Sequence, residues 1–147
     1  MRFGIAIGTV LILAAVVAGS AENEQTAGVY PLDHCIVSGK KLGDNAVTYV
    51  HEGRELRFCC GGCSDKFKAD PASYIAKLDK EIIEQQRDSY PLETCVIMSE
   101  DEIDPKLDFV YNNRLVRICC RDCTTDFNDD PAKYIALIDK AIIEKQK

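Results

Sequence analysis

Eight cysteines are the residues of this chain whose type and spacing could do chemistry. They form two groups of four with the same spacing, C-x23-C-C-x2-C, and the second group lies sixty positions after the first. The groups are Cys35, Cys59, Cys60 and Cys63, then Cys95, Cys119, Cys120 and Cys123. Thiolates bind thiophilic metals, and pairs of thiols form disulfides. The pattern therefore predicts two similar cysteine sites.

The residues that must position these cysteines are duplicated with them. The stretch from Tyr30 to Arg87 reappears without a gap from Tyr90 to Lys147, so we expect two modules, at residues 30–89 and 90–147. A module of this size is close to the limit at which apolar burial alone stabilises a fold. A metal or disulfides should therefore tie the first cysteine of each group to the other three.

Two stretches alternate apolar and polar residues around a two-residue turn, which is typical of a β-hairpin. In the first copy the apolar positions flank Glu52-Gly53 and are Val47, Tyr49, Leu56 and Phe58. In the second copy they flank Asn112-Asn113 and are Leu107, Phe109, Val116 and Ile118. Each predicted hairpin ends at a cysteine pair.

Helical signals follow each cysteine group. Asp70-Pro71 and Asp130-Pro131 place a capping carboxylate before a proline at the first helical position. Apolar residues then recur at spacings of three and four, at Tyr74, Ile75, Leu78 and Ile82 and at Tyr134, Ile135, Ile138 and Ile142. We expect a helix of about four turns after each site, with Phe67 or Phe127 on a shorter helix before it.

The predicted fold class is therefore small α+β. Two tandem modules should each contain a cysteine loop, a β-hairpin, a short helix and a longer C-terminal helix. The aromatic and aliphatic residues of these elements are expected to form the core.

The N-terminal residues have the features of a secretory signal peptide. Arg2 precedes an apolar run from Phe3 to Gly19 that ends in small residues. We expect residues 1–20 to be cleaved and residues 21–29 to form a linker, which predicts a secreted or periplasmic protein without stable membrane insertion. The alternative is an uncleaved N-terminal membrane anchor, although the apolar run is at the short limit for a span.

Charge and motif content exclude several other functions. The formal net charge is −6 and the chain has no basic patch, which disfavours nucleic acid binding because Lys and Arg supply most of that affinity. No catalytic carboxylate pair, nucleophile elbow or phosphate-binding glycine loop is present. We therefore expect no catalytic activity.

Several motifs resemble the YHS and TRASH group of treble-clef metal-binding domains. They are Cys35-Ile36-Val37-Ser38-Gly39-Lys40, the Glu52-Gly53-Arg54 turn, the F-C-x3-C element from Phe58 to Cys63, and the F-x-x-D-P-x-x-Y element from Phe67 to Tyr74. The resemblance covers nearly all of each repeat. It implies heavy-metal sensing, trafficking or resistance, with metal ions and a metal transport or resistance protein as partners.

The resemblance also implies a ligand set: Cys35, Cys59 and Cys63 in the first copy, and Cys95, Cys119 and Cys123 in the second. Cys60 and Cys120 are extra thiols that could supply a fourth sulfur. Related four-cysteine treble clefs have a second cysteine three residues after the first, where this chain has Ser38 and Met98. Structural zinc is almost always four-coordinate, whereas three thiolates suit Cu(I). The expected metal is therefore zinc or copper(I).

Other residues near the cysteines differ between the copies. His34 and His51 are further candidate ligands, but Thr94 and Tyr111 replace them in the second copy, and Met98 would add a thioether there alone. The acidic run Glu100-Asp101-Glu102 occupies the loop where the first copy has Lys40-Lys41. This difference could steer cations toward the second site, or it is surface divergence.

Two alternative functions remain open at this point. In an oxidising compartment, four cysteines per repeat could form two disulfides, giving a stapled, non-catalytic interaction module. The less favoured alternative is a thiol-disulfide redox protein that uses the C-x-x-C pairs Cys60/Cys63 and Cys120/Cys123. A repeat this short lacks the βαβ framework on which such oxidoreductases place that motif.

Overall fold

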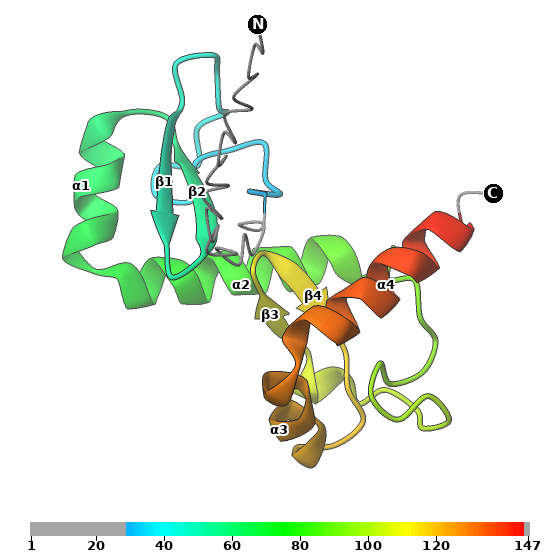
Figure 1. Ribbon diagram of the computed structural model, residues 1–147. Helices are drawn as coiled ribbons and strands as arrows, with labels where there is room; N and C mark the ends of the chain where they lie inside the picture. The colour runs from blue at the N-terminus through cyan, green and yellow to red at the C-terminus, as the bar shows by residue number, and fades with distance from the viewer. Residues whose placement is uncertain (1–28, 146–147) are drawn as a thin grey trace, which may run out of the picture.

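The computed structural model describes residues 29–145 (Figure 1). The predicted signal peptide and nearly all of the predicted linker lie outside the described residues. The elements of the described part confirm the small α+β class and two similar modules, each with one antiparallel hairpin and two helices. None of the helices in residues 29–145 is long and apolar enough to cross a membrane.

The two hairpins have the same kind of turn. β1 (Val47–His51) pairs with β2 (Arg54–Phe58), and β3 (Phe109–Tyr111) pairs with β4 (Arg114–Val116). The turn residues Glu52 and Gly53 have φ of 48° and 77°, and Asn112 and Asn113 have φ of 45° and 63°. Positive φ at both turn positions is the backbone of a type I′ turn, which matches the twist of the flanking strands and favours Gly and Asn.

The second hairpin is shorter than the sequence pattern predicts. Leu107 was expected in its first strand, but it lies in a 3-10 turn, η1 (Pro105–Leu107), and Ile118 lies beyond β4. Pro105 has no N–H to give to a strand ladder, and the Asp104 carboxylate accepts a hydrogen bond from the Lys106 backbone N–H at 3.0 Å. Local capping therefore replaces strand pairing at this point.

The helices begin where the sequence predicts. α1 (Gly61–Ala69) and α3 (Asp122–Asp129) are the short helices, and α2 (Pro71–Arg87) and α4 (Pro131–Lys145) are the long ones. The Asp70 carboxylate accepts a hydrogen bond from the Ser73 N–H at 3.4 Å, and Asp130 caps the Lys133 N–H at 3.1 Å. These bonds satisfy N–H groups that an uncapped helix start would leave without partners.

Each module has its own apolar core between its hairpin, its cysteine loop and its helices. Phe67, Leu78 and Ile82 are fully buried in the first core, and Phe127 and Ile138 in the second. The remaining predicted core positions of the long helices are partly buried against the same clusters. Because the cores also contain cysteines, the packing that stabilises each module also places its thiols.

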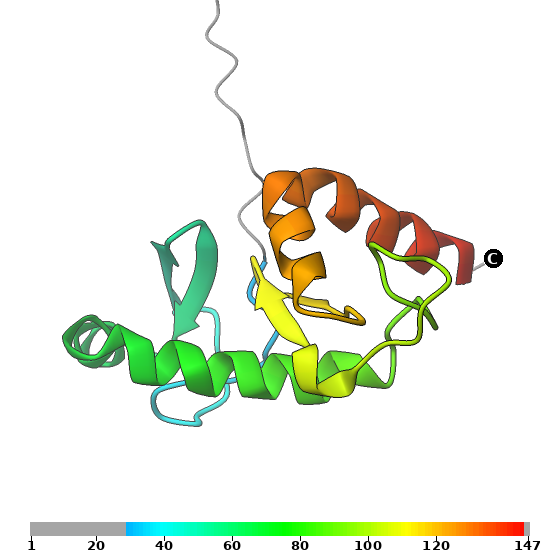
Figure 2. The ribbon, with the colours of Figure 1, turned by 90° about the horizontal axis from the view of Figure 1, so that it is seen from below.

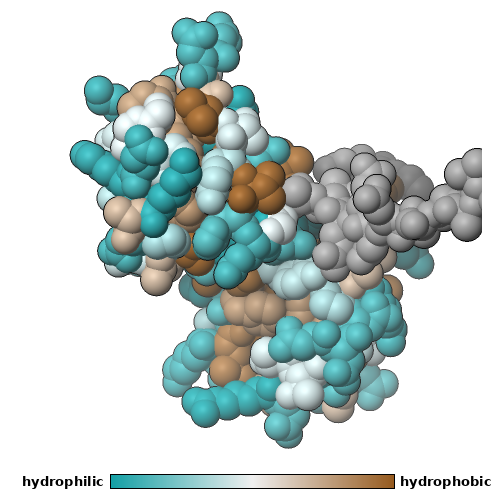
Figure 3. All heavy atoms as spheres, turned by 60° about the vertical axis from the view of Figure 1, so that its left-hand side comes forward, coloured by the Kyte–Doolittle hydropathy of each residue, from teal (hydrophilic) through white to brown (hydrophobic). Residues whose placement is uncertain are grey.

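The modules pack on each other through α2. This helix runs past both hairpins (Figure 2) and contacts β3 and β4 of the second module. Ile83 of α2 packs against the second core, and Val110 of β3 packs against the first. Figure 3 shows two lobes on the face it presents, largely covered by hydrophilic side chains. One helix thus contributes to both cores.

Asn113 connects the two hairpins at this interface. Its side chain is 1% exposed, accepts a hydrogen bond from Arg54 Nε at 3.0 Å and donates one to the Glu55 carbonyl at 2.8 Å. Gln86 of α2 donates to the Asn113 carbonyl at 3.1 Å and accepts from the Leu115 N–H at 2.8 Å. These buried polar bonds give the module contact a defined geometry.

A buried carboxylate holds the junction between the modules. The Asp108 side chain is 2% exposed and lies 2.9 Å from the Arg87 guanidinium and 3.1 Å from the Arg117 guanidinium. Arg87 is the last residue of α2, whereas Asp108 and Arg117 belong to the second module. The ion pairs therefore connect the end of α2 to the second hairpin.

Candidate metal centres

The structure brings three cysteines of each module together. In the first module these are Cys35 from the cysteine loop, Cys59 after β2 and Cys63 in the first turn of α1, with their sulfur atoms all within 4.8 Å of one another. Cys95, Cys119 and Cys123 form the equivalent cluster in the second module. We call these clusters triad 1 and triad 2. Both could hold a metal ion.

The spacing of the sulfur atoms fits a metal site. Cys59 Sγ lies 3.7 Å from Cys63 Sγ, and Cys123 Sγ lies 3.9 Å from Cys95 Sγ and 3.6 Å from Cys119 Sγ. With a Zn–S bond of about 2.3 Å, tetrahedral geometry places two sulfur ligands about 3.8 Å apart. The clusters therefore need little rearrangement to accept an ion of this kind.

Backbone hydrogen bonds close the cysteine loops. The Cys35 N–H donates to the Lys40 carbonyl at 2.8 Å, and the Gly39 N–H donates to the Cys35 carbonyl at 2.7 Å. Gly39 has a φ of 70°, a conformation that glycine adopts without strain. The turn presents the Cys35 side chain to the start of α1.

The corresponding loop of the second module is one residue longer. There the Cys95 N–H donates to the Asp101 carbonyl at 2.9 Å, so Asp101 takes the place that Lys40 has in the first module. The flanking β-bridges agree, since His34 pairs with Lys41 and Thr94 pairs with Glu102. The expectation of a gapless repeat is thus wrong within this loop. In the second module, the segment between this loop and the hairpin is one residue shorter. The sixty-residue offset between the two copies is therefore restored at Phe109.

Hydrogen bonds lower the pKa of the loop cysteine of each triad. Burial raises the pKa of Cys35, but hydrogen bonds from the Ser38 hydroxyl and from the backbone at Cys59, Ser38 and Val37 outweigh it and bring the pKa to about 7. Burial also opposes ionisation of Cys95, yet backbone hydrogen bonds, including the Met98 N–H at 3.3 Å from Cys95 Sγ, lower its pKa. In each triad, hydrogen bonds therefore favour ionisation of the loop cysteine.

The helix cysteines have the opposite tendency. Burial, followed by contact with Cys59 and Cys60, raises the pKa of Cys63 to about 12, and burial is also the main reason that the pKa of Cys123 is raised. Burial likewise raises the pKa of Cys119 to about 11. Ionisation of Cys63, Cys119 and Cys123 is thus disfavoured unless a cation compensates the charge.

Cys60 and Cys120 lie outside the triads. Both are exposed; Cys60 Sγ is 3.7 Å from Cys63 Sγ, and Cys120 Sγ is 3.2 Å from Cys123 Sγ. All eight cysteines are free thiols in the structure. Contacts with the Cys63 backbone and thiol lower the pKa of Cys60. The fourth thiol of each module is therefore an accessible neighbour of one triad member.

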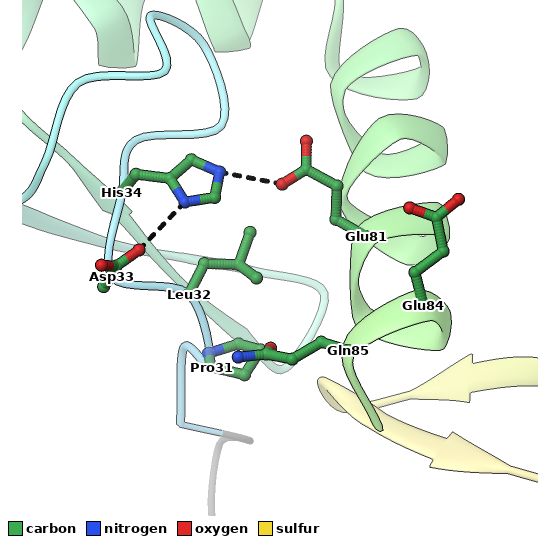
Figure 4. A pocket seen from close by; sticks show the side chains of 7 residues that line it. All are labelled: Pro31, Leu32, Asp33, His34, Glu81, Glu84 and Gln85. Atoms are coloured by element: carbon green, nitrogen blue, oxygen red, sulfur yellow. Dashed lines mark hydrogen bonds and ion pairs between the residues drawn. The ribbon is translucent and has the colours of Figure 1, made fainter. Parts of the chain in front are cut away.

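Neither histidine belongs to a triad, and Met98 contacts triad 2 through its backbone N–H. His34 Nε2 lies 2.8 Å from Glu81 Oε2 and Nδ1 lies 3.2 Å from Asp33 Oδ1, beside an open hollow along α2 (Figure 4). The His51 ring packs edge-on against Phe67, with 5.2 Å between centroids. Met98 is 50% exposed. The sequence hypotheses that made these residues ligands receive no support from their positions.

Two oxygen-bearing side chains contact the triads instead. Ser38 Oγ lies 3.2 Å from Cys59 Sγ, and Asp101 Oδ2 lies 3.8 Å from Cys119 Sγ. Sequence reasoning noted Ser38 as the place of an absent cysteine and Asp101 as part of an acidic loop. It could not place either next to a particular thiol, because the loop lengths differ between the copies.

Comparison of the chain with protein-family models, with curated proteins and with solved structures found no match. The two cysteine triads are nevertheless compatible with a tandem metal-binding protein.

Proposed function

We propose that this chain is an exported, non-catalytic protein that binds one thiophilic metal ion in each module and acts in metal sequestration, trafficking or sensing. The observation that carries the proposal is the duplicated triad, in which sulfur atoms from three separate segments lie within 4.8 Å of one another. The resemblance of the motifs to YHS and TRASH domains supports the same function. The apolar run of residues 3–19 supports export.

The donor set selects the class of metal. Three thiolates, without an imidazole in the cluster, suit soft or borderline ions such as Cu(I) and Zn(II) and do not suit Ca²⁺ or Mg²⁺, which prefer oxygen ligands. Hydrogen bonds lower the pKa of the loop cysteines Cys35 and Cys95, which favours the thiolate form that a metal binds. The bound cation would then favour loss of the remaining protons. A metal transport or resistance protein is the expected partner.

The test is metal uptake by the reduced protein under anaerobic conditions. Zn(II) or Cu(I) is titrated in competition with a chromophoric chelator, and we expect two ions per chain. Replacing Cys35 and Cys63 together by serine should leave one ion per chain. Cys60→Ser, which removes a thiol outside the triad, is the matched control and should keep both ions. The proposal is refuted if the protein takes up neither metal, or if uptake is unchanged after loss of Cys35 and Cys63.

A disulfide-stapled interaction module is the second candidate. The observation that favours it is the contact between Cys120 Sγ and Cys123 Sγ at 3.2 Å, with the 3.7 Å contact of Cys60 and Cys63 in the first module. Oxidation of these pairs would remove one thiol from each triad. Mass measurement of the protein from its native compartment, with and without alkylation, separates this state from a metal-bound, reduced one.

A further inference from the structure

We infer that Asp101 is the fourth ligand of triad 2, which makes the second module a site for a divalent ion such as Zn(II), whereas triad 1 is an all-thiolate site for Cu(I). This inference rests on the metal-binding function proposed above and assigns a different class of ion to each module. It comes from the side chains that contact the middle cysteine of each triad.

Asp101 is the carboxylate in contact with triad 2. Its Oδ2 lies 3.8 Å from Cys119 Sγ, and its carbonyl accepts the Cys95 N–H at 2.9 Å, so the loop backbone holds it between two members of the triad. The side chain is exposed, and Cys119 is the partly exposed member of triad 2. Asp101 does not belong to the group of atoms within 4.8 Å of one another, so a change of its side-chain rotamer is needed for the carboxylate to join the three sulfur atoms.

The first module has no carboxylate in this place. The residue that closes its loop is Lys40, and the oxygen in contact with Cys59 Sγ is the Ser38 hydroxyl at 3.2 Å. A hydroxyl next to a thiolate donates a hydrogen bond and leaves the sulfur as the metal ligand. Triad 1 therefore offers three sulfur atoms and a nearby cationic residue, whereas triad 2 offers three sulfur atoms and an anionic oxygen.

These donor sets favour different ions. Zn(II) prefers four ligands and accepts Asp oxygen together with Cys sulfur, whereas Cu(I) is soft and selects thiolates. Three thiolates with Cu(I) carry a charge of −2, and three thiolates and a carboxylate with Zn(II) carry the same charge. The one-residue-longer loop of the second module is thus the feature that converts an S3 site into an S3O site.

The experiment isolates triad 2 within the full chain. In a Cys35→Ser, Cys63→Ser background only triad 2 is intact, and Asp101→Asn should lower its Zn(II) affinity at least about tenfold, because even second-shell changes at metal sites cost ten- to a hundredfold. The Cu(I) affinity should change by less than about twofold, because Cu(I) needs only the thiolates. Glu100→Gln, an equal charge change one residue away, is the matched control.

A cobalt spectrum provides the second readout. Co(II) replaces Zn(II), and its visible absorption bands report on tetrahedral coordination; we expect these bands with triad 2 and their loss in Asp101→Asn. Equal effects of Asp101→Asn and Glu100→Gln on Zn(II) affinity would overturn the inference, as would a triad 2 that binds Cu(I) but not Zn(II). Those outcomes leave the proposed function standing, whereas absence of any metal uptake by the parent protein refutes both.

Discussion

The two triads have similar internal geometry but different surroundings. In both modules the sulfur atoms lie within 4.8 Å of one another and come from a loop, a strand end and a helix start. Around them, Ser38 and Lys40 in the first module give way to a longer acidic loop with Asp101 in the second. The fold therefore places the cysteines alike in both modules, whereas the loop residues beside them differ.

The long helices show a second difference between the modules. α2 belongs to the first module but also packs against β3 and β4 of the second, whereas α4 serves the core of the second module. Ile82 of α2 is fully buried in the first core, but its counterpart Ile142 is only partly buried in the second. Duplication has thus produced an asymmetric pair, in which one helix stabilises both halves.

The largest expected effect distinguishes the triads from the fourth thiols. Loading triad 1 with Cu(I) and triad 2 with Zn(II) should slow alkylation of their six cysteines at least about a hundredfold, because the thiolate is the reactive form and the metal binds it strongly. Cys60 and Cys120 should remain reactive, since they are exposed and lie outside the triads. Mass spectrometry of alkylated peptides measures each site. Equal protection of all eight cysteines would contradict the assignment.

Stability measurements test the asymmetry of the helices. We expect Ile82→Ala to lower the free energy of unfolding by about 3 kcal/mol, because it removes buried methyl groups from a fully packed site. Ile142→Ala, the matched change in α4, should cost only about 1 kcal/mol because that side chain is partly exposed. Urea unfolding of the metal-free, reduced protein gives both values. Equal losses would contradict the difference in burial between the two side chains.

Substitutions in the turn of the second hairpin should have a smaller effect on the free energy of unfolding. Replacing Asn113 by glycine, the residue that Gly53 provides in the first module, should cost about 2 kcal/mol because Arg54 and the Glu55 carbonyl lose a buried partner. Asn112→Gly is the control, since its φ is also positive, and should cost about 0.5 kcal/mol. If the two variants are equally stable in urea, the Asn113 contacts do not stabilise the interface.

The smallest expected effect depends on pH. Hydrogen bonds to Asp33 and to Glu81 raise the pKa of His34 above its usual value, although burial opposes them. A raised pKa in the folded state means that protonated His34 stabilises the protein below about pH 6.5, and that this contribution is lost as pH rises through the folded-state pKa.

Replacing His34 by threonine, the residue at this position in the second module, measures this contribution. His34→Thr should lower the free energy of unfolding by about 0.5 kcal/mol at pH 5.5, a magnitude typical of partly exposed pairs, and by less at pH 8.5. Urea unfolding at both pH values is the measurement. A loss that does not depend on pH would show that charge on His34 makes no contribution.

Local signals predicted most of the fold. Asp70-Pro71 and Asp130-Pro131 begin the long helices, and turn residues that tolerate positive φ mark both hairpins. The failure at Leu107 has a local cause, because Asp104 and Pro105 cap a turn within an alternating pattern. The interface could not be predicted, since Asn113 bonds to Arg54 and Glu55, which lie in the other repeat and share no sequence signal with it.

The candidate site was only partly visible in the sequence. Cysteine spacing grouped the thiols by module, but it did not show that Cys60 and Cys120 lie outside the triads. The position of Asp101 was hidden by compensating length changes. One residue added in the loop and one lost before the hairpin leave the sixty-residue offset intact on either side.

The most direct test of the account is the intact mass and metal content of the protein from its native compartment. Native mass spectrometry should find two metal ions per chain, and denaturing mass spectrometry after alkylation should find eight reduced cysteines, the thiol state of the structure. A chain without metal whose mass is lower by eight hydrogens would carry four disulfides. That result would contradict the metal-binding account.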